Sequence, residues 1–600
     1  MKLAYTPEYL TIETSSYLLQ LAPVPHNSFL RDRHSGRLFA FAAGGDCDPT
    51  GRSDETIDAS AWEVVEKTPS YILLANEVVS PCWESKKFLI RLEKDRMEFW
   101  HEINGKGSLQ EVRFFRVCHH GNEFGFCGDV DEVFTVAPNF HEQRYYHTSQ
   151  SVIHCYGTDF SLIAGCMALA SVPHVLALHD RNDAWYTVFG AFARPGHYDW
   201  DEFRWNPASK HAPTAYIGDA VLGGGFALCY FGKKTVDGQW ESPRLCVTFA
   251  DGENQVLTSA LAQAYDREYM PRPAGKKQFP DWWKEPIYCT WHDQAAIADG
   301  DKVDFNTPGE TPVGELCTQA NTDRWLDLLC KNNCTPGTVI LDDKWQRTLC
   351  SGEPDTAKWP DLRKWIDECH RKGIRVFLWG MAWYKDGIPE NEMITRDGKP
   401  VCGDITHPAF ETRVREMVRK MFSDAPDCLN ADGIKIDGFL GLPTGAGLKN
   451  YGNIWGLELQ KRFLEIFHGE AKKHKTEVCI SVYTANPYLD AYSDMIRLGD
   501  MWTSRISPRQ AMISRAAAIR IMHPGTLIDT DGQFYYSGDP DYISLLDTQA
   551  GLGIPTIYVA EKLRHGHFYL QPVLKDLSAG DYRHIAEVFE KYRKENKLER

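Results

Sequence analysis

Aspartates and tryptophans end many of the apolar runs in the second half of the chain, and side chains of these types could act on sugars. Cleaving an acetal needs one carboxylate that attacks the anomeric carbon or activates water, and another that protonates the leaving oxygen. Carboxylate oxygens bind sugar hydroxyls, and aromatic rings pack on sugar C–H faces. A structural role explains polar strand ends, but not four aspartate positions with tryptophans between them. We therefore expect a carbohydrate site.

Eight apolar runs must position these side chains. They are 286–291, 338–342, 374–379, 433–437, 477–482, 495–500, 526–529 and 555–559. Apolar residues recur at helical spacing in the segments 322–330, 361–369 and 410–418, and a polar helix is expected at about 581–597. This alternation predicts an α/β fold, a (β/α)8 TIM barrel, in which functional residues gather at the carboxyl ends of the strands.

The first half of the chain follows a different pattern. Short runs rich in β-branched and aromatic residues lie between turn-forming Gly, Asp, Asn and Pro, at 71–75, 88–92, 97–101, 186–190, 225–229 and 245–249. They predict an antiparallel β-sandwich, and the Pro- and Lys-rich stretch that follows predicts a linker. The expected organisation is an N-terminal β-sandwich domain at 1–270, a linker at 271–283 and a catalytic barrel at 284–600.

Composition limits the partners. The 600 residues carry a net charge of −16, which disfavours nucleic acid and anionic membranes as partners. No apolar run is long enough to span a bilayer, and the first residues do not form an export signal. The 17 cysteines lack the paired spacing of a zinc site, and no nucleotide-binding loop is present. We expect a cytoplasmic protein with reduced thiols and with no metal or cofactor.

Five motifs resemble those of the α-galactosidase clan, in particular glycoside hydrolase family thirty-six and its raffinose-synthase relatives. In the order of that family, across about residues 285–560, they are Ile340-Leu-Asp-Asp-Lys-Trp345, Gly373-Ile-Arg-Val-Phe-Leu-Trp379, Asp404-Ile-Thr-His-Pro408, Ile434-Lys-Ile-Asp437 and Met501-Trp-Thr-Ser504. The family also carries an N-terminal β-domain. The resemblance implies a retaining glycoside hydrolase that cleaves α-glycosidic bonds, most simply those of terminal α-galactosides, by double displacement.

The resemblance assigns catalytic roles to two aspartates. Asp437 would be the nucleophile, and Lys435, two residues earlier and on the same face of the strand, would hold substrate hydroxyls and keep Asp437 ionised. The family's acid/base aspartate follows its Trp-x-Ser motif directly, but this chain has Arg505 there, which cannot donate a proton at neutral pH. Asp500, at the end of an Arg-x-x-Asp motif, is therefore the predicted acid/base.

An aspartate at the end of the seventh strand, Asp529 or Asp531, is the alternative acid/base. The other side chains at the strand ends are expected to bind substrate. The resemblance implies that Asp342 and Asp343 accept hydrogen bonds from O4 and O6 of the sugar, which favours galactose. The remaining predicted substrate-binding residues are Trp291, Trp345, Trp379, Arg497, Trp502 and Arg505.

Two other functions remain open at this point. Arg505 is consistent with an α-glycosidase or transglycosidase for a modified or anionic sugar. Loss of the family's aspartate at that position is also consistent with a non-catalytic carbohydrate-binding barrel, although the intact Lys435 and Asp437 pair argues against it. The expected partner is an oligosaccharide or small glycoside. Homo-oligomers are common in the resembled family, but no interface is visible in the sequence.

Overall fold

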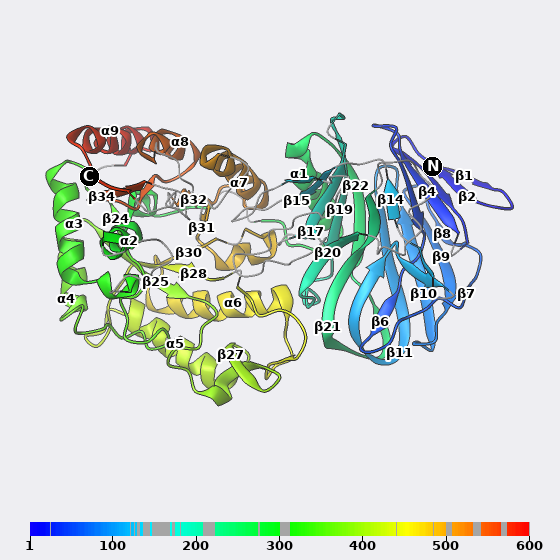
Figure 1. Ribbon diagram of the computed structural model, residues 1–600, viewed down its shortest axis with the longest axis horizontal. Helices are drawn as coiled ribbons and strands as arrows, with labels where there is room; N and C mark the ends of the chain where they lie inside the picture. Colours follow the sequence, from blue (N-terminus) through cyan, green and yellow to red (C-terminus); the bar gives the residue numbers. More distant parts are fainter. Residues whose placement is uncertain are drawn as a thin grey trace.

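The computed structural model forms two lobes that lie side by side, with the N-terminus in one lobe and the C-terminus in the other (Figure 1). The structure describes residues 1–600 except 24–25, 120–121, 125, 129–131, 136–143, 147–167, 171–173, 181, 208–221, 274–276, 301–311, 440, 484, 500–506, 532–541, 566–572 and 599–600.

The N-terminal lobe is built from antiparallel strands. They are β1 (Lys2–Tyr5), β2 (Leu10–Glu13), β3 (Tyr17–Leu21), β4 (Asn27–Asp32), β5 (Leu38–Ala42), β6 (Cys47–Pro49), β7 (Asp58–Ala59), β8 (Glu63–Lys67), β9 (Ile72–Val79), β10 (Ser85–Leu92), β11 (Met97–Phe114), β12 (Val117–His119), β13 (Asn122–Phe124), β14 (Phe126–Gly128), β15 (Glu132–Thr135), β16 (Arg144–Tyr146), β17 (Ala168–Ala170), β18 (Val175–His179), β19 (Trp185–Phe192), β20 (Glu202–Pro207), β21 (Leu222–Glu241) and β22 (Arg244–Asp251).

Alternating burial explains why these runs form sheets. Along β9, for example, every second side chain is buried, so that one face joins the core and the other faces solvent. The predicted N-terminal β-sandwich is confirmed, and each of the six runs named in the sequence lies in a strand. The helix α1 (Glu253–Asp266) was not expected in this half. Its apolar side chains recur at helical spacing and pack on β19 and β22.

The second lobe contains a parallel barrel. Its strands are β23 (Ile287–Cys289), β24 (Thr338–Leu341), β25 (Arg375–Met381), β28 (Gly433–Asp437), β30 (Cys479–Val482), β31 (Met495–Arg497), β32 (Leu527–Asp529) and β33 (Thr556–Ile557). Each pairs in parallel with the next, β33 pairs with β23, and a parallel bridge between Asp529 and Ile554 closes the ring. All eight predicted strands are therefore confirmed, and so is the (β/α)8 barrel.

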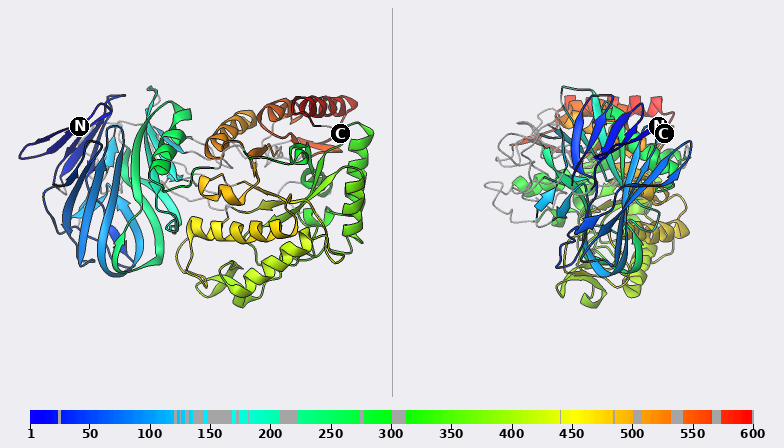
Figure 2. Two further views of the ribbon diagram at one scale, coloured as in Figure 1. Left: turned by 180° about the vertical axis from the view of Figure 1, so that it is seen from behind. Right: turned by 90° about the vertical axis from the view of Figure 1, so that its right-hand side faces the viewer.

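Helices connect these strands and cover the barrel, as the view from behind also shows (Figure 2). They are α2 (Trp291–Gly300), α3 (Gln319–Lys331), α4 (Leu362–Arg371), α5 (Pro408–Phe422), α6 (Gly456–His474), α7 (Pro508–Met522), α8 (Leu545–Leu552) and α9 (Ala579–Glu595), with the 3₁₀ helices η1 (Asp281–Lys284), η2 (Val313–Leu316), η3 (Glu390–Glu392), η4 (Pro487–Tyr492) and η5 (Tyr542–Ser544). The four predicted helices in this half are confirmed as α3, α4, α5 and α9.

Two small antiparallel sheets complete the second lobe. Their strands are β26 (Met393–Arg396), β27 (Lys399–Gly403) and β29 (Leu448–Lys449), and β34 (Lys562–His565) and β35 (Val573–Asp576). Within the described part of the chain, no helix is long and apolar enough to cross a membrane. The domain limits at 270 and 284 stay a prediction.

The N-terminal lobe packs on the face of the barrel where the strands end. Helix α6 follows β28, so its first residue, Gly456, lies on that face. A Cβ atom at Gly456 would lie 2.1 Å from the carbonyl oxygen of Trp200, which explains the glycine. The backbone N–H of Tyr198 donates to Glu458 at 3.0 Å, and that of Gly196 donates to the Tyr488 hydroxyl at 2.9 Å. The lobe thus borders the strand ends that carry the predicted site.

Candidate active site

Asp437 ends β28 and keeps an open path to solvent, with 37% of its side chain exposed. Its Oδ1 accepts hydrogen bonds from the backbone N–H of Gly438 at 3.0 Å and from the Arg497 guanidinium at 3.2 Å. Its Oδ2 accepts from the indole N–H of Trp379 at 3.2 Å. Burial alone would raise its pKa, but the positive charges of Arg497 and Lys435 outweigh that effect and lower it. The carboxylate is therefore oriented, accessible and ionised at neutral pH.

Lys435 lies beneath this carboxylate, with only 2% of its side chain exposed. Its ammonium group donates to Asp342 Oδ2 at 2.7 Å and to the Tyr558 hydroxyl at 3.1 Å, and lies 3.7 Å from Cys289 Sγ. Burial would lower its pKa, but the Asp342 carboxylate raises it on balance, so the lysine stays charged. Its observed partners are protein groups. Direct contact with substrate hydroxyls stays a prediction.

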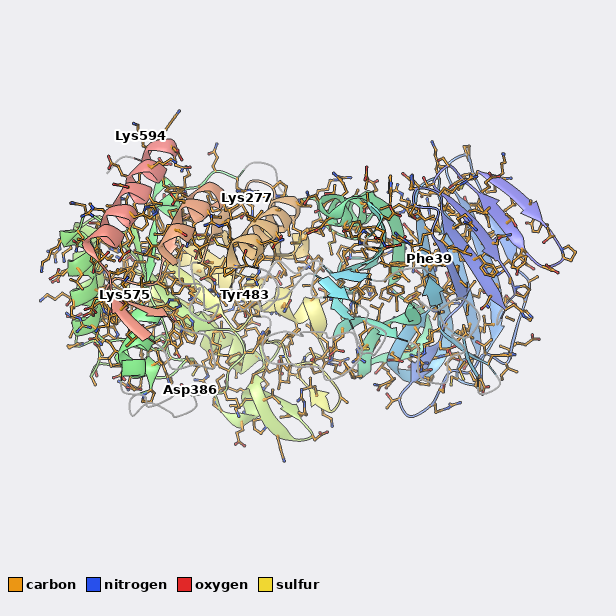
Figure 3. The ribbon with its side chains drawn as sticks, turned by 45° about the horizontal axis from the view of Figure 1, so that its top comes forward. Phe39, Lys277, Asp386, Tyr483, Lys575 and Lys594 are labelled. Carbon is orange, nitrogen blue, oxygen red and sulfur yellow. The ribbon has the colours of Figure 1, made fainter. Side chains whose placement is uncertain are left out.

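Arg497 joins Asp437 to a second, fully buried carboxylate. One nitrogen of its guanidinium donates to Asp531 Oδ2 at 2.8 Å, while the other bonds to Asp437. Its guanidinium carbon lies 5.0 Å from the ring centre of Tyr483, which belongs to the barrel lobe (Figure 3). The Tyr558 hydroxyl donates to the other oxygen of Asp531. The observed role of Arg497 is therefore to position two protein carboxylates, and its predicted contact with substrate is untested.

The two alternative acid/base residues are both buried. Asp531 has its oxygens bonded to Arg497 and Tyr558. Asp529 accepts from the backbone N–H of Asp531 at 2.8 Å and from the hydroxyl of Thr556 on the closing strand. Burial, reinforced by the charge of Asp531, raises the pKa of Asp529 to about 6. Both carboxyls are buried, and whether either acts as the acid/base stays a prediction.

The predicted acid/base Asp500 lies outside the described residues, as do Trp502 and Arg505. The nearest described neighbour of Asp500 in the chain is Gly499, two residues after Arg497.

Asp342 and Asp343 follow β24 on the same rim. Asp342 is buried and accepts from Lys435 and from the thiol of Cys289, at 3.1 Å. Asp343 is half-buried, and its pKa is raised to about 6 by burial first and then by the charges of Asp342 and Asp437. The predicted pair is therefore split. One carboxylate belongs to the buried network, while the other is left partly accessible.

The tryptophans of the rim have different roles. Trp345 is fully buried, and its indole N–H donates to the carbonyl oxygen of Trp379 at 2.8 Å, so it supports Trp379 from below. Trp379 in turn bonds to Asp437. Trp291 begins α2 and is partly buried against the apolar cluster that fills the barrel. The sequence predicted these three residues as walls of the pocket, and the structure places Trp379 beside Asp437.

The sequence did not single out Tyr558 or Cys289, although both touch Lys435. Tyr558 belongs to a predicted strand, and the alternation of side chains along a strand could have placed it inside the barrel. Asp293 also has a role that only the structure shows. It accepts from the Tyr288 hydroxyl at 2.8 Å and from the backbone N–H of Ala560 at 2.6 Å, and burial raises its pKa to about 7. It ties the first strand to the last.

Among the described residues, no group of three or more His, Cys, Asp or Glu side chains is arranged to hold a metal ion. The chain matches no known protein family and no curated protein sequence.

Solved structures do share the fold. The α-N-acetylgalactosaminidase NagBb of Bifidobacterium bifidum, in complex with GalNAc, superposes with a TM-score of 0.59 and 12% identity over 98% of this chain and 93% of that chain. A family 31 sulfoquinovosidase from E. rectale, in complex with an aza-sugar inhibitor, gives a TM-score of 0.53 and 12% identity over 99% and 83%. The expected resemblance to the glycosidases of this clan is therefore confirmed for the fold.

Proposed function

We propose that this chain is a retaining α-glycoside hydrolase, acting most simply on terminal α-galactosides, with Asp437 as its nucleophile. The observation that carries the proposal is the Asp437 carboxylate. It ends a barrel strand, stays ionised and accessible, and has both oxygens oriented by fixed donors. A barrel with this fold places its chemistry at the strand ends. The shared fold of glycosidases that act on different sugars supports the reaction class.

In the proposed mechanism the Asp437 carboxylate attacks the anomeric carbon while an acid protonates the leaving oxygen. Arg497, Gly438 and Trp379 hold the carboxylate in one orientation, so that little freedom is lost on reaching the transition state. A covalent glycosyl-enzyme results, and water then releases the sugar with retained configuration. Asp500 is the proposed acid/base. It follows Arg497 by three residues, and Arg497 itself touches Asp437.

Asp343 is the described carboxyl best placed to select the sugar, because it is partly accessible on the same rim as Asp437. The resemblance favours a galactose O4 or O6 as its partner. One structural neighbour was solved with GalNAc, and the other is a sulfoquinovosidase, so the fold alone does not choose the sugar. A modified or anionic sugar, or transfer to a sugar acceptor, is the second candidate. A cytoplasmic location is part of the proposal.

The test is hydrolysis of a panel of aryl α- and β-glycosides that includes galactosides, N-acetylgalactosaminides and sulfoquinovosides. Asp437→Asn should lower kcat by about 10⁴-fold or more, because it removes the nucleophile but keeps the shape of the side chain. Asp237→Asn, the same change at an exposed ion pair of the N-terminal lobe, is the matched control and should retain activity. A 2-fluoro glycoside should label Asp437, as detected by mass spectrometry.

Three results would contradict parts of this proposal. A product of inverted configuration, read by NMR, would exclude double displacement. Full activity of Asp437→Asn would exclude the assigned nucleophile. Sugar binding without turnover of any glycoside would favour the non-catalytic barrel instead.

A further inference from the structure

A pocket of about 270 Å³ is lined by residues of the N-terminal lobe alone. The side chains that matter for its chemistry are Arg194, Asp199, Tyr230, Gln239, Trp240 and Glu241. A second hollow of about 390 Å³ shares the last three of these residues and continues over β10 and β11. Strands β11 and β21 run side by side here, with Ile103 opposite Trp240 (Figure 1). The second hollow falls within the size range of small-ligand sites, roughly 300–1,000 Å³, and the first lies just below it.

The hydroxyl of Tyr230 is the strongest sign that this pocket takes a ligand. Tyr230 is fully buried, lines the pocket, and its oxygen finds no hydrogen-bond partner among the described residues. Its ring packs edge-on against Trp240, with centroids 6.1 Å apart. A buried hydroxyl without a partner costs free energy, about 1–3 kcal/mol, so buried polar groups are normally satisfied. A ligand hydroxyl in this pocket would supply the missing bond.

The charges around the pocket indicate the class of that ligand. Asp199 pairs with Lys234 at 2.5 Å, and Glu241 pairs with Arg244 at 2.7 Å. Both carboxylates are thereby held in place and balanced, and Arg194 adds one positive charge to the lining. One unbalanced positive charge is fewer than a phosphate or another multiply charged anion normally meets in its site. Carboxylate and amide groups beside an indole ring suit a ligand that has several hydroxyls and an apolar face.

We propose that this pocket is an accessory saccharide-binding site, in which Trp240 packs on a sugar ring and Tyr230 and Gln239 bond to its hydroxyls. The identity of the sugar rests on the proposed function, but the site itself does not. The loop that connects β19 to β20 supplies Arg194 and Asp199 to the pocket. The same loop contacts the barrel through Gly196 and Tyr198. A bound oligosaccharide is thus retained beside the domain interface.

The binding test uses full-length protein with Asp437→Asn, which prevents turnover, and the tetrasaccharides stachyose and maltotetraose as probes. Isothermal titration should give about two sugars per chain, falling to about one when Trp240→Ala is added. Tyr230→Phe removes a single oxygen and should weaken the accessory site by about tenfold. Gln239→Ala, at an exposed position, should weaken it less. Tyr5→Phe, on the exposed strand β1, is the matched control and should change nothing.

The kinetic test uses the active chain. Trp240→Ala should raise KM for the cleaved tetrasaccharide by about fivefold or more. It should leave kcat/KM for a small aryl α-glycoside unchanged, because that substrate does not reach the pocket. The thermal unfolding midpoint of Tyr230→Phe should be no lower than that of the parent, because the change removes an unpartnered buried hydroxyl, and this separates lost binding from lost folding.

The outcomes separate this inference from the proposed function. If aryl glycosides are cleaved but none of the three substitutions changes tetrasaccharide binding, the accessory site is wrong and the function stands. If nothing is cleaved but Tyr230→Phe and Trp240→Ala abolish binding of one sugar, the function is wrong and the accessory site stands.

Discussion

The two lobes each bury a lysine beside carboxylates, but only one of these networks reaches solvent. In the N-terminal lobe, Lys86 lies 2.6 Å from Asp54 and 3.6 Å from Asp46, and all three side chains are fully buried. In the barrel, Lys435 is equally buried against Asp342, yet the network extends through its neighbours to the exposed Asp437. The first network is closed to solvent, and the second presents a partly exposed carboxylate.

Perturbed pKa values occur in both networks and do not tell them apart. In the N-terminal lobe, burial raises the pKa of Asp46 to about 8 and lowers that of His101 to about 3. Asp54 has a lowered pKa because Lys86 and several hydrogen bonds outweigh its burial. The same balance lowers the pKa of Asp437. Exposure of one member, rather than the shift itself, therefore distinguishes the candidate site from the structural cluster.

The largest expected effect tests this distinction directly. Asp437→Asn should lower kcat by about 10⁴-fold or more while the chain stays folded. Asp54→Asn, the same change in the closed network, should leave kcat per folded molecule unchanged but lower the thermal unfolding midpoint. Calorimetry and a glycosidase assay on the same preparations measure both. Loss of activity in Asp54→Asn at a temperature where it is folded would break the comparison.

Replacing the lysines should destabilise both lobes. Lys86→Met and Lys435→Met each leave buried carboxylates unpaired, at an expected cost of about 3–5 kcal/mol. Only Lys435→Met should also move the acidic limb of the kcat/KM profile. Lys435 lowers the pKa of Asp437, so that pKa rises when the lysine is removed. As the pH is lowered, the variant should then begin to lose activity at a higher pH than the parent does. An unchanged acidic limb would show that Lys435 does not act on Asp437.

Asp343 should show a smaller effect that depends on pH. Its pKa is near 4 in an unfolded chain and is raised to about 6 in the folded one. The folded state therefore binds its proton more tightly, and stability falls as pH rises from about 4 to 6. Asp343→Asn removes this loss, and should raise the free energy of unfolding by about 2–3 kcal/mol at pH 7 but by little at pH 4. Urea unfolding at both pH values measures it, and equal effects would refute the shift.

The smallest effect concerns Trp345, which supports Trp379 beside Asp437. Trp345→Phe removes the indole N–H that bonds to the Trp379 carbonyl, at a cost of about 1 kcal/mol. Trp379 should then hold Asp437 less firmly, and kcat should fall by severalfold while KM for an aryl glycoside stays constant. A rise in KM alone would instead make Trp345 a substrate contact, as the sequence predicted.

Most of the fold followed from local patterns. Apolar runs that repeat with helices between them predicted the eight barrel strands, because eight strand-then-helix units are typical of a closed parallel barrel. Helix α1 was missed although its apolar residues recur at helical spacing, because it stands in a region dominated by strand-forming sequence.

The candidate site also combines features that the sequence predicts with features that only the tertiary structure decides. The sequence by itself determined that Asp437, Lys435, Asp342 and Arg497 end strands of one barrel, because side chains at strand ends meet on one rim whatever the loops do. Only the tertiary structure decided which of them remain accessible. Lys435 and Arg497 are buried among side chains from segments distant in the sequence, including Tyr558 and Tyr483, and such long-range contacts leave no local pattern. Asp437 alone of these four is left exposed to a substrate.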